Sequence, residues 1–343
     1  MFHGVLVVIK FITEPSFGEN ISEGKMALVN YFTSLNPLSL VKSLPAGIAQ
    51  GLIWGIMALG VYITFRLLDI ADLSVDGTFT TGGAVTVMLI TACGCPAWLA
   101  LLVAILAGLA AGTVTGLLHT LLGIPAILAG ILTQFALYSI NLAIMGMKSN
   151  QAVSVDKYNL ILSSRTVPMA IVTGIIFSVI IIAILYWYFG TEQGSALRAT
   201  GCNAAMARAQ GININTMKVI GLALSNGIVA LAGGMMSQYQ GFADINMGRG
   251  AIVIGLAAVI IGEVIGEAIF KKYLNFALRL GFVVFGGIMY YVIVVLVLWM
   301  KLDSNFLKLL TAVIVAIFLA VPYLRGKQKS SFKKAGKGSG KNA

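Results

Sequence analysis

The chain has 343 residues, of which 59% are hydrophobic and 10% are charged, and its formal net charge is +11. A typical soluble domain has about 25% charged residues, and apolar runs of about 18 residues or more recur along this chain, so a soluble globular protein is excluded. The positive charge does not indicate a nucleic-acid partner, because seven of the 23 basic residues lie together after Leu324. The composition predicts an all-α fold, a polytopic membrane bundle of about nine helices.

Three parts follow one another along the chain. Residues 1–42 are interpreted as an N-terminal extension, extracytoplasmic or interfacial, without a recognisable signal-peptide cleavage site. Residues 43–323 form the membrane domain. Residues 324–343 are rich in lysine, glycine and serine, so we expect a basic, disordered tail that lies in the cytoplasm beside anionic lipid.

Hydropathy predicts nine membrane spans, some of them short or broken. Their approximate ranges are 43–65, 70–92, 96–118, 124–147, 166–189, 216–240, 249–265, 273–300 and 304–323. Lysine and arginine are somewhat more frequent on the side that carries the basic tail, and this is the cytoplasmic side by the usual charge asymmetry. We therefore expect the N-terminus outside and the C-terminus in the cytoplasm.

Glycine recurs at every fourth residue in two of these spans. The positions are Gly47, Gly51 and Gly55 in the first span and Gly108, Gly112 and Gly116 in the third. Small residues let helix backbones approach closely in lipid, so both rows are predicted to be packing faces. Pro125, at the start of the fourth span, predicts a helix that is short or re-entrant.

Enzyme chemistry has no visible basis in this sequence. The two histidines, His3 and His119, have no cysteine or carboxylate at metal-ligand spacing, and Cys93 and Cys95 are too close for an easy disulfide. No serine stands in a nucleophile motif within a span. We therefore predict no catalytic residue, no metal and no cofactor.

The stretch RLLDIADLSVDGTFTTGG holds three acids near the start of the second span. Asp69, Asp72 and Asp76 are three and four residues apart, so a continuous helix would place them on one face. Arg66 is spaced to pair with Asp69. We interpret Asp69 and Asp72 as a solvated or ion-paired inner helix end. Asp76 lies deeper, and both a solute pathway and a helix break stay open for it.

Other polar residues within the spans either line a solute path or serve as hydrogen-bonding contacts between helices. The pathway candidates are Asp76, Thr78, Gln134, Ser139, Asn141 and Asn226. A further polar group begins at the end of the sixth span and is expected at the outer mouth, where it could meet a delivery protein. This group comprises Gln238, Gln240, Asp244, Asn246 and Arg249.

One polar segment between two long apolar spans is far longer than a turn requires. It reads GSALRATGCNAAMARAQGIN over residues 194–213, with many alanines and two arginines. Together with three other stretches it resembles bacterial ABC-importer permeases of the branched-chain amino acid and ribose group. The similarity is greatest to the branch with an SVDG motif, described as tryptophan/tyrosine-like or uncharacterised. The other stretches are GLIWGIMALGVYITFRLLDIADLSVDGTFTTGGA, LYSINLAIMG and LSNGIVALAGGMMSQYQGFADINMGRGAIVIGLAAVIIGE.

The resemblance covers about residues 44–323 and makes residues 43–323 an ABC-importer permease domain. It implies a bacterial plasma (inner) membrane, two cytoplasmic ATPases, an extracytoplasmic solute-binding protein and a second permease copy, with an aromatic or branched-chain amino acid as the expected solute. The polar segment then becomes the coupling segment that docks on the ATPase. Gly201 is expected to divide it into two short helices, with Asn203 capping the second and Gly211 ending it. The expected ATPase-coupling residues are Arg198, Ala199, Gly201, Asn203, Ala207, Arg208 and Gly211.

Three positions depart from the pattern of the family. Cys202 stands where an acidic residue is expected, Ala143 where a basic one is common, and Arg249 where a small or apolar one is usual. The main alternative is a stand-alone secondary transporter, a class that favours inverted repeats and charges at the membrane midplane. We see no such repeat, and the acids lie mostly near helix ends. The chain has no nucleotide-binding motif, so ATP-driven transport requires a partner.

Overall fold

The computed structural model describes residues 37–155, 157–270 and 275–300, with three single positions beyond them. These residues form ten α-helices, one π-helical turn and two short strands. The ninth expected span and the basic tail lie outside the described residues apart from those single positions, and so does the N-terminal extension before residue 37.

The helices follow the order that hydropathy predicts. They are α3 (Pro37–Tyr62) with the π-helical turn η1 (Ile63–Leu67), α4 (Val75–Cys93), α5 (Ala97–Thr120), α6 (Ala126–Ile144), α7 (Val167–Gly190), α8 (Glu192–Cys202), α9 (Ala204–Ala209), α10 (Ile214–Gln240), α11 (Ala251–Phe270) and α12 (Phe276–Trp299). Seven of the described helices are long and apolar enough to cross a membrane. The expected polytopic α-helical bundle is confirmed, and α4 joins it although its threonine-rich sequence keeps it out of those seven.

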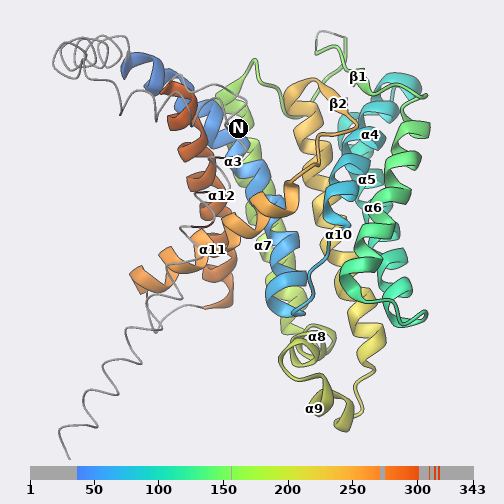
Figure 1. Ribbon diagram of the computed structural model, residues 1–343. Helices are drawn as coiled ribbons and strands as arrows, with labels where there is room; N and C mark the ends of the chain where they lie inside the picture. The colour runs from blue at the N-terminus through green and yellow to red at the C-terminus, as the bar shows by residue number, and fades with distance from the viewer. Residues whose placement is uncertain are drawn as a thin grey trace, which may run out of the picture.

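The helix α10 forms the centre of the bundle and packs against α3, α4 and α5 (Figure 1). The helices α11 and α12 pack against α3 on one side, and α6 packs against α4 and α5 on the other. The helix α7 is the most exposed span, with side chains such as Ile180 and Trp187 on its surface. The polar side chains of α4 and α10 are thereby kept away from lipid.

Both predicted glycine rows are packing faces. A Cβ atom on Gly51 would lie 2.7 Å from the Cα atom of Ile288 in α12, and one on Gly116 would lie 2.8 Å from the Cα atom of Val219 in α10. Real Cβ atoms do not approach that closely, so these helix pairs require glycine. Backbone contact of this kind is how small residues hold helices together in lipid.

The second span begins later than hydropathy predicts. Residues 69–72 are not helical, Asp69 has a positive φ of 55°, and α4 begins at Val75. The three acids therefore do not share a helical face, and that expectation is wrong. Non-helical backbone is tolerated at this depth only inside protein, and Ile70, Asp72 and Ser74 are indeed buried.

Short elements close the two ends of the bundle. At one end, β1 (Asn150–Ala152) pairs antiparallel with β2 (Phe242–Asp244), with Gln151 opposite Ala243. At the other end, α8 and α9 extend beyond the long helices (Figure 1). The helix α6 begins after Pro125 and is long enough to cross a membrane, so the expected short or re-entrant helix is wrong.

Candidate functional site: a polar pocket and a coupling segment

The first polar cluster, around Asp72, is buried inside the protein. Asp72 is 2% exposed, and its Oδ1 accepts hydrogen bonds from the Ser74 backbone N–H at 2.9 Å and from the Ser74 hydroxyl at 2.6 Å. Its Oδ2 accepts a hydrogen bond from Asn226 Nδ2 in α10 at 2.7 Å. The expected solvated or ion-paired inner end is therefore wrong for Asp72, which joins α4 to α10 inside the protein.

The expected pairing of Arg66 with Asp69 is also wrong. Arg66 Nε lies 2.9 Å from Glu263 Oε1, which belongs to α11, and Asp69 is exposed. The reason is the turn at Asp69, because a left-handed residue directs the chain away from the helix that carries Arg66. Asp69 keeps the solvated role that the sequence allows.

Asp76 lies in the first turn of α4 and holds the start of another helix. Its Oδ2 accepts the Gly250 N–H at 2.9 Å, and its Oδ1 accepts the Ile252 N–H at 2.9 Å. These amides belong to the N-terminus of α11, where N–H groups lack partners within the helix. A carboxylate is also favoured there by the helix dipole. Asp76 therefore caps α11, whereas its own helix α4 continues through it without a break.

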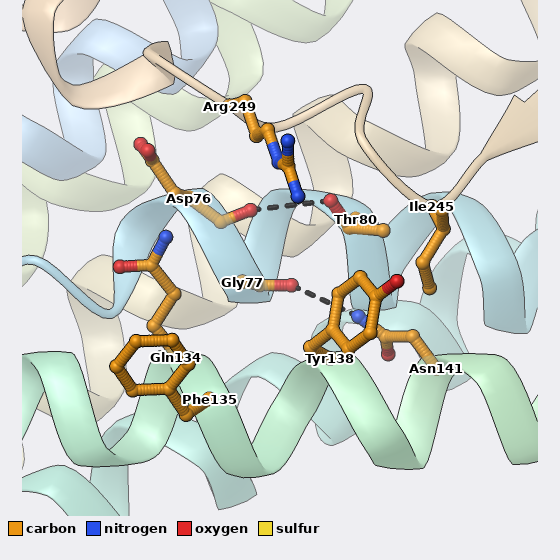
Figure 2. Close-up of a pocket in the computed structure, with 9 residues that line it drawn as sticks. All are labelled: Asp76, Gly77, Thr80, Gln134, Phe135, Tyr138, Asn141, Ile245 and Arg249. Atoms are coloured by element: carbon orange, nitrogen blue, oxygen red, sulfur yellow. Dashed lines mark hydrogen bonds between the residues drawn. The ribbon is translucent and has the colours of Figure 1, made fainter.

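Beside Asp76 lies a pocket of about 350 Å³ between α4, α6 and the loop that joins β2 to α11 (Figure 2). Its lining residues are Asp76, Gly77, Thr80, Gln134, Phe135, Tyr138, Asn141, Ile245 and Arg249. The volume falls within the about 300–1,000 Å³ of typical small-molecule sites, which combine apolar walls with a few placed polar groups.

Two polar groups in this pocket have unused hydrogen-bonding capacity. Asn141 is 1% exposed; its Nδ2 donates to the Gly77 carbonyl at 3.3 Å, whereas its Oδ1 has no partner among the described residues. Arg249 is exposed, and no carboxylate of the described residues lies within 4.0 Å of its nitrogen atoms. Figure 2 shows its guanidinium pointing from the loop into the pocket.

The pathway candidates from the sequence divide into three kinds. Asp76, Gln134 and Asn141 line the pocket. Thr78 and Asn226 are both 0% exposed and hydrogen-bond inside the protein, Thr78 to the Ser74 carbonyl and Asn226 to Asp72. Ser139 is exposed on α6 but lies outside the lining.

The pathway candidates predicted from the sequence do not include five of the lining residues, namely Gly77, Thr80, Phe135, Tyr138 and Ile245. A signal for Tyr138 was present, because Gln134, Tyr138 and Asn141 recur at helical spacing and therefore share one face of α6. Arg249, which was expected to face a binding protein at the outer mouth, lines the pocket.

The expected binding-protein face is only partly at the surface. Gln238 is 1% exposed; its Oε1 accepts the Ile161 N–H at 3.1 Å and its Nε2 donates to the Ala97 carbonyl at 3.4 Å. This side chain therefore braces three segments and does not face a partner. Gln240 and Asp244 are half-buried, and Asn246 is exposed beside β2.

The coupling segment folds as two short helices, as the sequence predicts. The helix α8 is capped by Thr191, and α9 is capped by Asn203, whose Oδ1 accepts the Met206 N–H at 3.0 Å. Gly201 lies within α8 and not at the break; a Cβ atom there would collide with the Leu67 carbonyl oxygen of η1. Gly211 follows α9 with a φ of 82°, the left-handed conformation expected of it.

The two arginines of the coupling segment have different surroundings. Arg198 is half-buried, its Nη2 donates to the Phe189 carbonyl at 2.7 Å, and its guanidinium lies 5.7 Å from the ring centre of Phe276. It therefore fastens α8 to α7 and α12, and its contact with an ATPase stays a prediction. Arg208 is exposed on α9, where Met206 is 63% exposed and the side chain of Ala207 is buried.

Comparison with known proteins gives the family to which the chain belongs. The model of the family described as "Branched-chain amino acid transport system / permease component" matches residues 43–318. The chain belongs to this family. As a permease, it is a multi-pass membrane subunit of an ABC-type importer and not an enzyme.

Relatives of the permease include a tyrosine transport system permease protein of Clostridioides difficile (strain R20291), 39% identical over 79% of this chain and 88% of the relative. An uncharacterised protein of Rickettsia prowazekii (strain Madrid E) is 36% identical over 79% of this chain and 94% of its own. An autoinducer 2 import system permease protein of Yersinia pestis (strain Pestoides F) is 29% identical over 68% of this chain and 64% of its own. No solved structure matches the permease.

Proposed function

We propose that this permease imports an amino acid across a bacterial plasma membrane and is powered by an ATPase that docks on α9. An extracytoplasmic binding protein delivers the solute at the end of the bundle that carries β1 and β2. The C. difficile relative named for tyrosine transport supports the solute class. In this arrangement the α8–α9 end and the C-terminus face the cytoplasm.

The observation that carries this proposal is the exposed surface of α9. Ala204, Ala205, Met206 and Arg208 are all exposed on a helix of six residues that extends beyond the bundle. Alanines let a partner approach closely, and a cation next to them can pair with an acidic groove. A stand-alone secondary transporter would have no use for such a projecting surface.

Docking is tested by placing bulk and negative charge on this surface. The double variant Ala205→Trp/Arg208→Glu keeps the buried Ala207, so we expect normal amounts of permease in the membrane. We expect at least about tenfold less ATPase to co-purify and a matching loss of uptake, because both closeness and charge complementarity are lost.

The matched control is Gln193→Glu, which adds one negative charge to an exposed position of α8. It should leave ATPase binding unchanged. Wild-type ATPase recovery and uptake in the α9 double variant would show that this surface is not the docking element.

We further propose that two permease copies pair in the working importer. An ATPase pair requires two docking segments, and the part of the chain that the structure describes carries one, formed by α8 and α9. Closed two-fold symmetry is the usual arrangement of two identical chains. Asn226 takes no part in this pairing, because it is fully buried against Asp72.

Pairing is tested by cysteine cross-linking in a variant whose native Cys93, Cys95 and Cys202 are serine. Ser139→Cys is expected to cross-link between copies, because Ser139 is exposed on α6 and so is accessible to a second copy. Ile180→Cys, 49% exposed on α7, is the control and should not cross-link. An active complex with one permease copy would overturn the pairing.

A further inference from the structure

The pocket beside Asp76 contains an arginine with no visible counter-charge. The side chain of Arg249 has neither a carboxylate nor a hydrogen-bond partner among the described residues that line or surround it. A cation inside a membrane protein normally pairs with an acid or marks the route of a charged solute. Because Asp76 is the acidic residue of the lining and directs both oxygens to the amides of α11, Arg249 is left to meet an anion from outside.

The position of Arg249 is fixed by its neighbours. Gly248 N–H donates to Thr80 Oγ1 at 3.2 Å, and Gly250 N–H donates to Asp76 Oδ2 at 2.9 Å. The residues on both sides of Arg249 are thus attached to α4. A Cβ atom on Gly248 would collide with the Asp76 carbonyl oxygen, so the loop lies directly against the helix. Arg249 is therefore presented to the pocket by a braced loop.

A second unused group belongs to Asn141, which lines the same pocket. Asn141 Oδ1 is a buried acceptor without a partner among the described residues, and an unpaired buried acceptor is unfavourable enough to be rare. A ligand that brings a hydrogen-bond donor would satisfy it. Asp76, which also lines the pocket, adds a negative charge that favours a cationic group on the ligand.

The wall opposite α4 is aromatic. Phe135 and Tyr138 on α6 are 69% and 44% exposed, and both line the pocket. Figure 2 shows their rings projecting from α6 toward the space that Asp76 and Arg249 border. Flat apolar groups pack favourably against such rings.

We propose that this pocket is a substrate site within the permease itself, built for an α-amino acid with an aromatic side chain. The carboxylate of the ligand pairs with Arg249, its ammonium donates to Asn141 Oδ1, and its ring packs against Phe135 and Tyr138. The inference rests on the proposed import function and adds that the permease, and not only the binding protein, selects the solute. Planar carboxylates suit arginine because the pairing is bidentate.

The test measures binding without the binding protein. The permease and its ATPase, held in lipid nanodiscs, are mixed with tritiated L-tyrosine, and bound label is counted by scintillation proximity. Unlabelled L-tyrosine and L-phenylalanine should displace the label. Tyramine, which lacks the carboxylate, and 3-(4-hydroxyphenyl)propionate, which lacks the ammonium, should each compete at least about tenfold more weakly, because each loses one charge-assisted contact.

Substitutions in the permease test whether the ligand binds in this pocket. Arg249→Gln should weaken L-tyrosine binding at least about tenfold and reduce the preference for L-tyrosine over tyramine, whereas Arg249→Lys should retain part of both. The matched control is Lys148→Gln, which removes one positive charge from an exposed position outside the pocket and should bind as the wild type does.

The outcomes separate this inference from the proposed function. If tyramine competes as well as L-tyrosine, or if Arg249→Gln binds like the control, the permease site is wrong even though the ATPase co-purifies and uptake continues. If the ATPase does not associate with the wild-type permease, the proposed function itself fails. The competition series on the wild type decides the matter even where a variant does not fold.

Discussion

Asp72 and Asp76 lie four residues apart at the start of α4, and their surroundings are opposite. Asp72 is closed in by Ser74 and Asn226 and has no contact with the pocket. Asp76 is half-buried, caps α11 and borders a pocket that also holds the unpaired Asn141 Oδ1 and Arg249. Two acids that look equivalent in the sequence thus differ in their surroundings: the neighbours of Asp72 are hydrogen-bonded within the protein, whereas polar groups beside Asp76 have unused hydrogen-bonding capacity.

This difference shows how a polar residue within a membrane protein should be judged. A polar group whose partners are all supplied by the protein stabilises the fold, and its removal leaves donors without acceptors. A pocket with unused donors and acceptors has capacity for a ligand. Depth in the membrane, on which the sequence argument relied, does not separate the two cases.

The largest expected effect is that of Asp72→Ala. It leaves the Ser74 N–H and one N–H of Asn226 Nδ2 without their acceptor, and each stranded buried donor costs about 1–3 kcal/mol. The Ser74 hydroxyl keeps Asn226 Oδ1, and the second N–H of Asn226 keeps the Leu222 carbonyl. We expect little folded permease in the membrane and a clear drop in the thermal unfolding midpoint in detergent.

A reciprocal exchange sharpens this prediction. In Asp72→Asn/Asn226→Asp the amide and the carboxylate change places. The amide oxygen at position 72 can still accept from Ser74, while the amide nitrogen there donates to the carboxylate at position 226. The double variant should be more stable than Asp72→Ala. A midpoint for Asp72→Ala equal to that of the wild type would contradict the structural role.

An intermediate effect is expected for Asp76→Ala. Loss of the cap on α11 costs about 0.5–2 kcal/mol, as for other helix N-caps, and it loosens the loop that carries Arg249. Folded permease should persist while uptake falls several-fold. Asp76→Asn keeps one acceptor oxygen, so its uptake should lie between that of Asp76→Ala and that of the wild type. Uptake unchanged in both variants would remove Asp76 from the site.

The smallest effect is expected for Asp69→Asn. Asp69 is exposed, and its positive φ suits asparagine as well as aspartate. The change in unfolding free energy should stay within about 0.5 kcal/mol, with normal uptake. Asp69→Val is the informative comparison, because a β-branched residue is strained at this φ. The thermal unfolding midpoint of Asp69→Val should therefore fall. Equal thermal unfolding midpoints for the two variants would show that the backbone turn is not required.

Much of the fold could be predicted because hydropathy and glycine spacing are local properties. The first eight expected spans, the two glycine faces, and the Asn203 cap and Gly211 conformation of the coupling segment all depend on neighbouring residues. The start of α4 could not be located, because Asp72 and Asp76 are satisfied by Asn226 and by Gly250 and Ile252, more than 150 positions further along the chain.

The candidate site was less predictable for the same reason. Hydropathy does not give the rotation of a helix about its axis, so Ser139 and Asn141 on α6 were treated alike although one is exposed and the other buried. Arg198 looked like a docking residue, and its binding to the Phe189 carbonyl depends on how α8 folds back against α7. Contacts between distant segments, and not residue type, decide these roles.

The short loop between β2 and α11 is hydrogen-bonded to other segments at both of its ends. Ile245 N–H donates to the Ser149 carbonyl at 2.9 Å beside the sheet, and three residues later Gly248 N–H donates to Thr80 Oγ1 in α4. Any displacement of the sheet is therefore transmitted along a few residues to the pocket. A fluorescent or spin label at the exposed Asn246 would act as a remote reporter of what happens at Arg249, without itself entering the pocket.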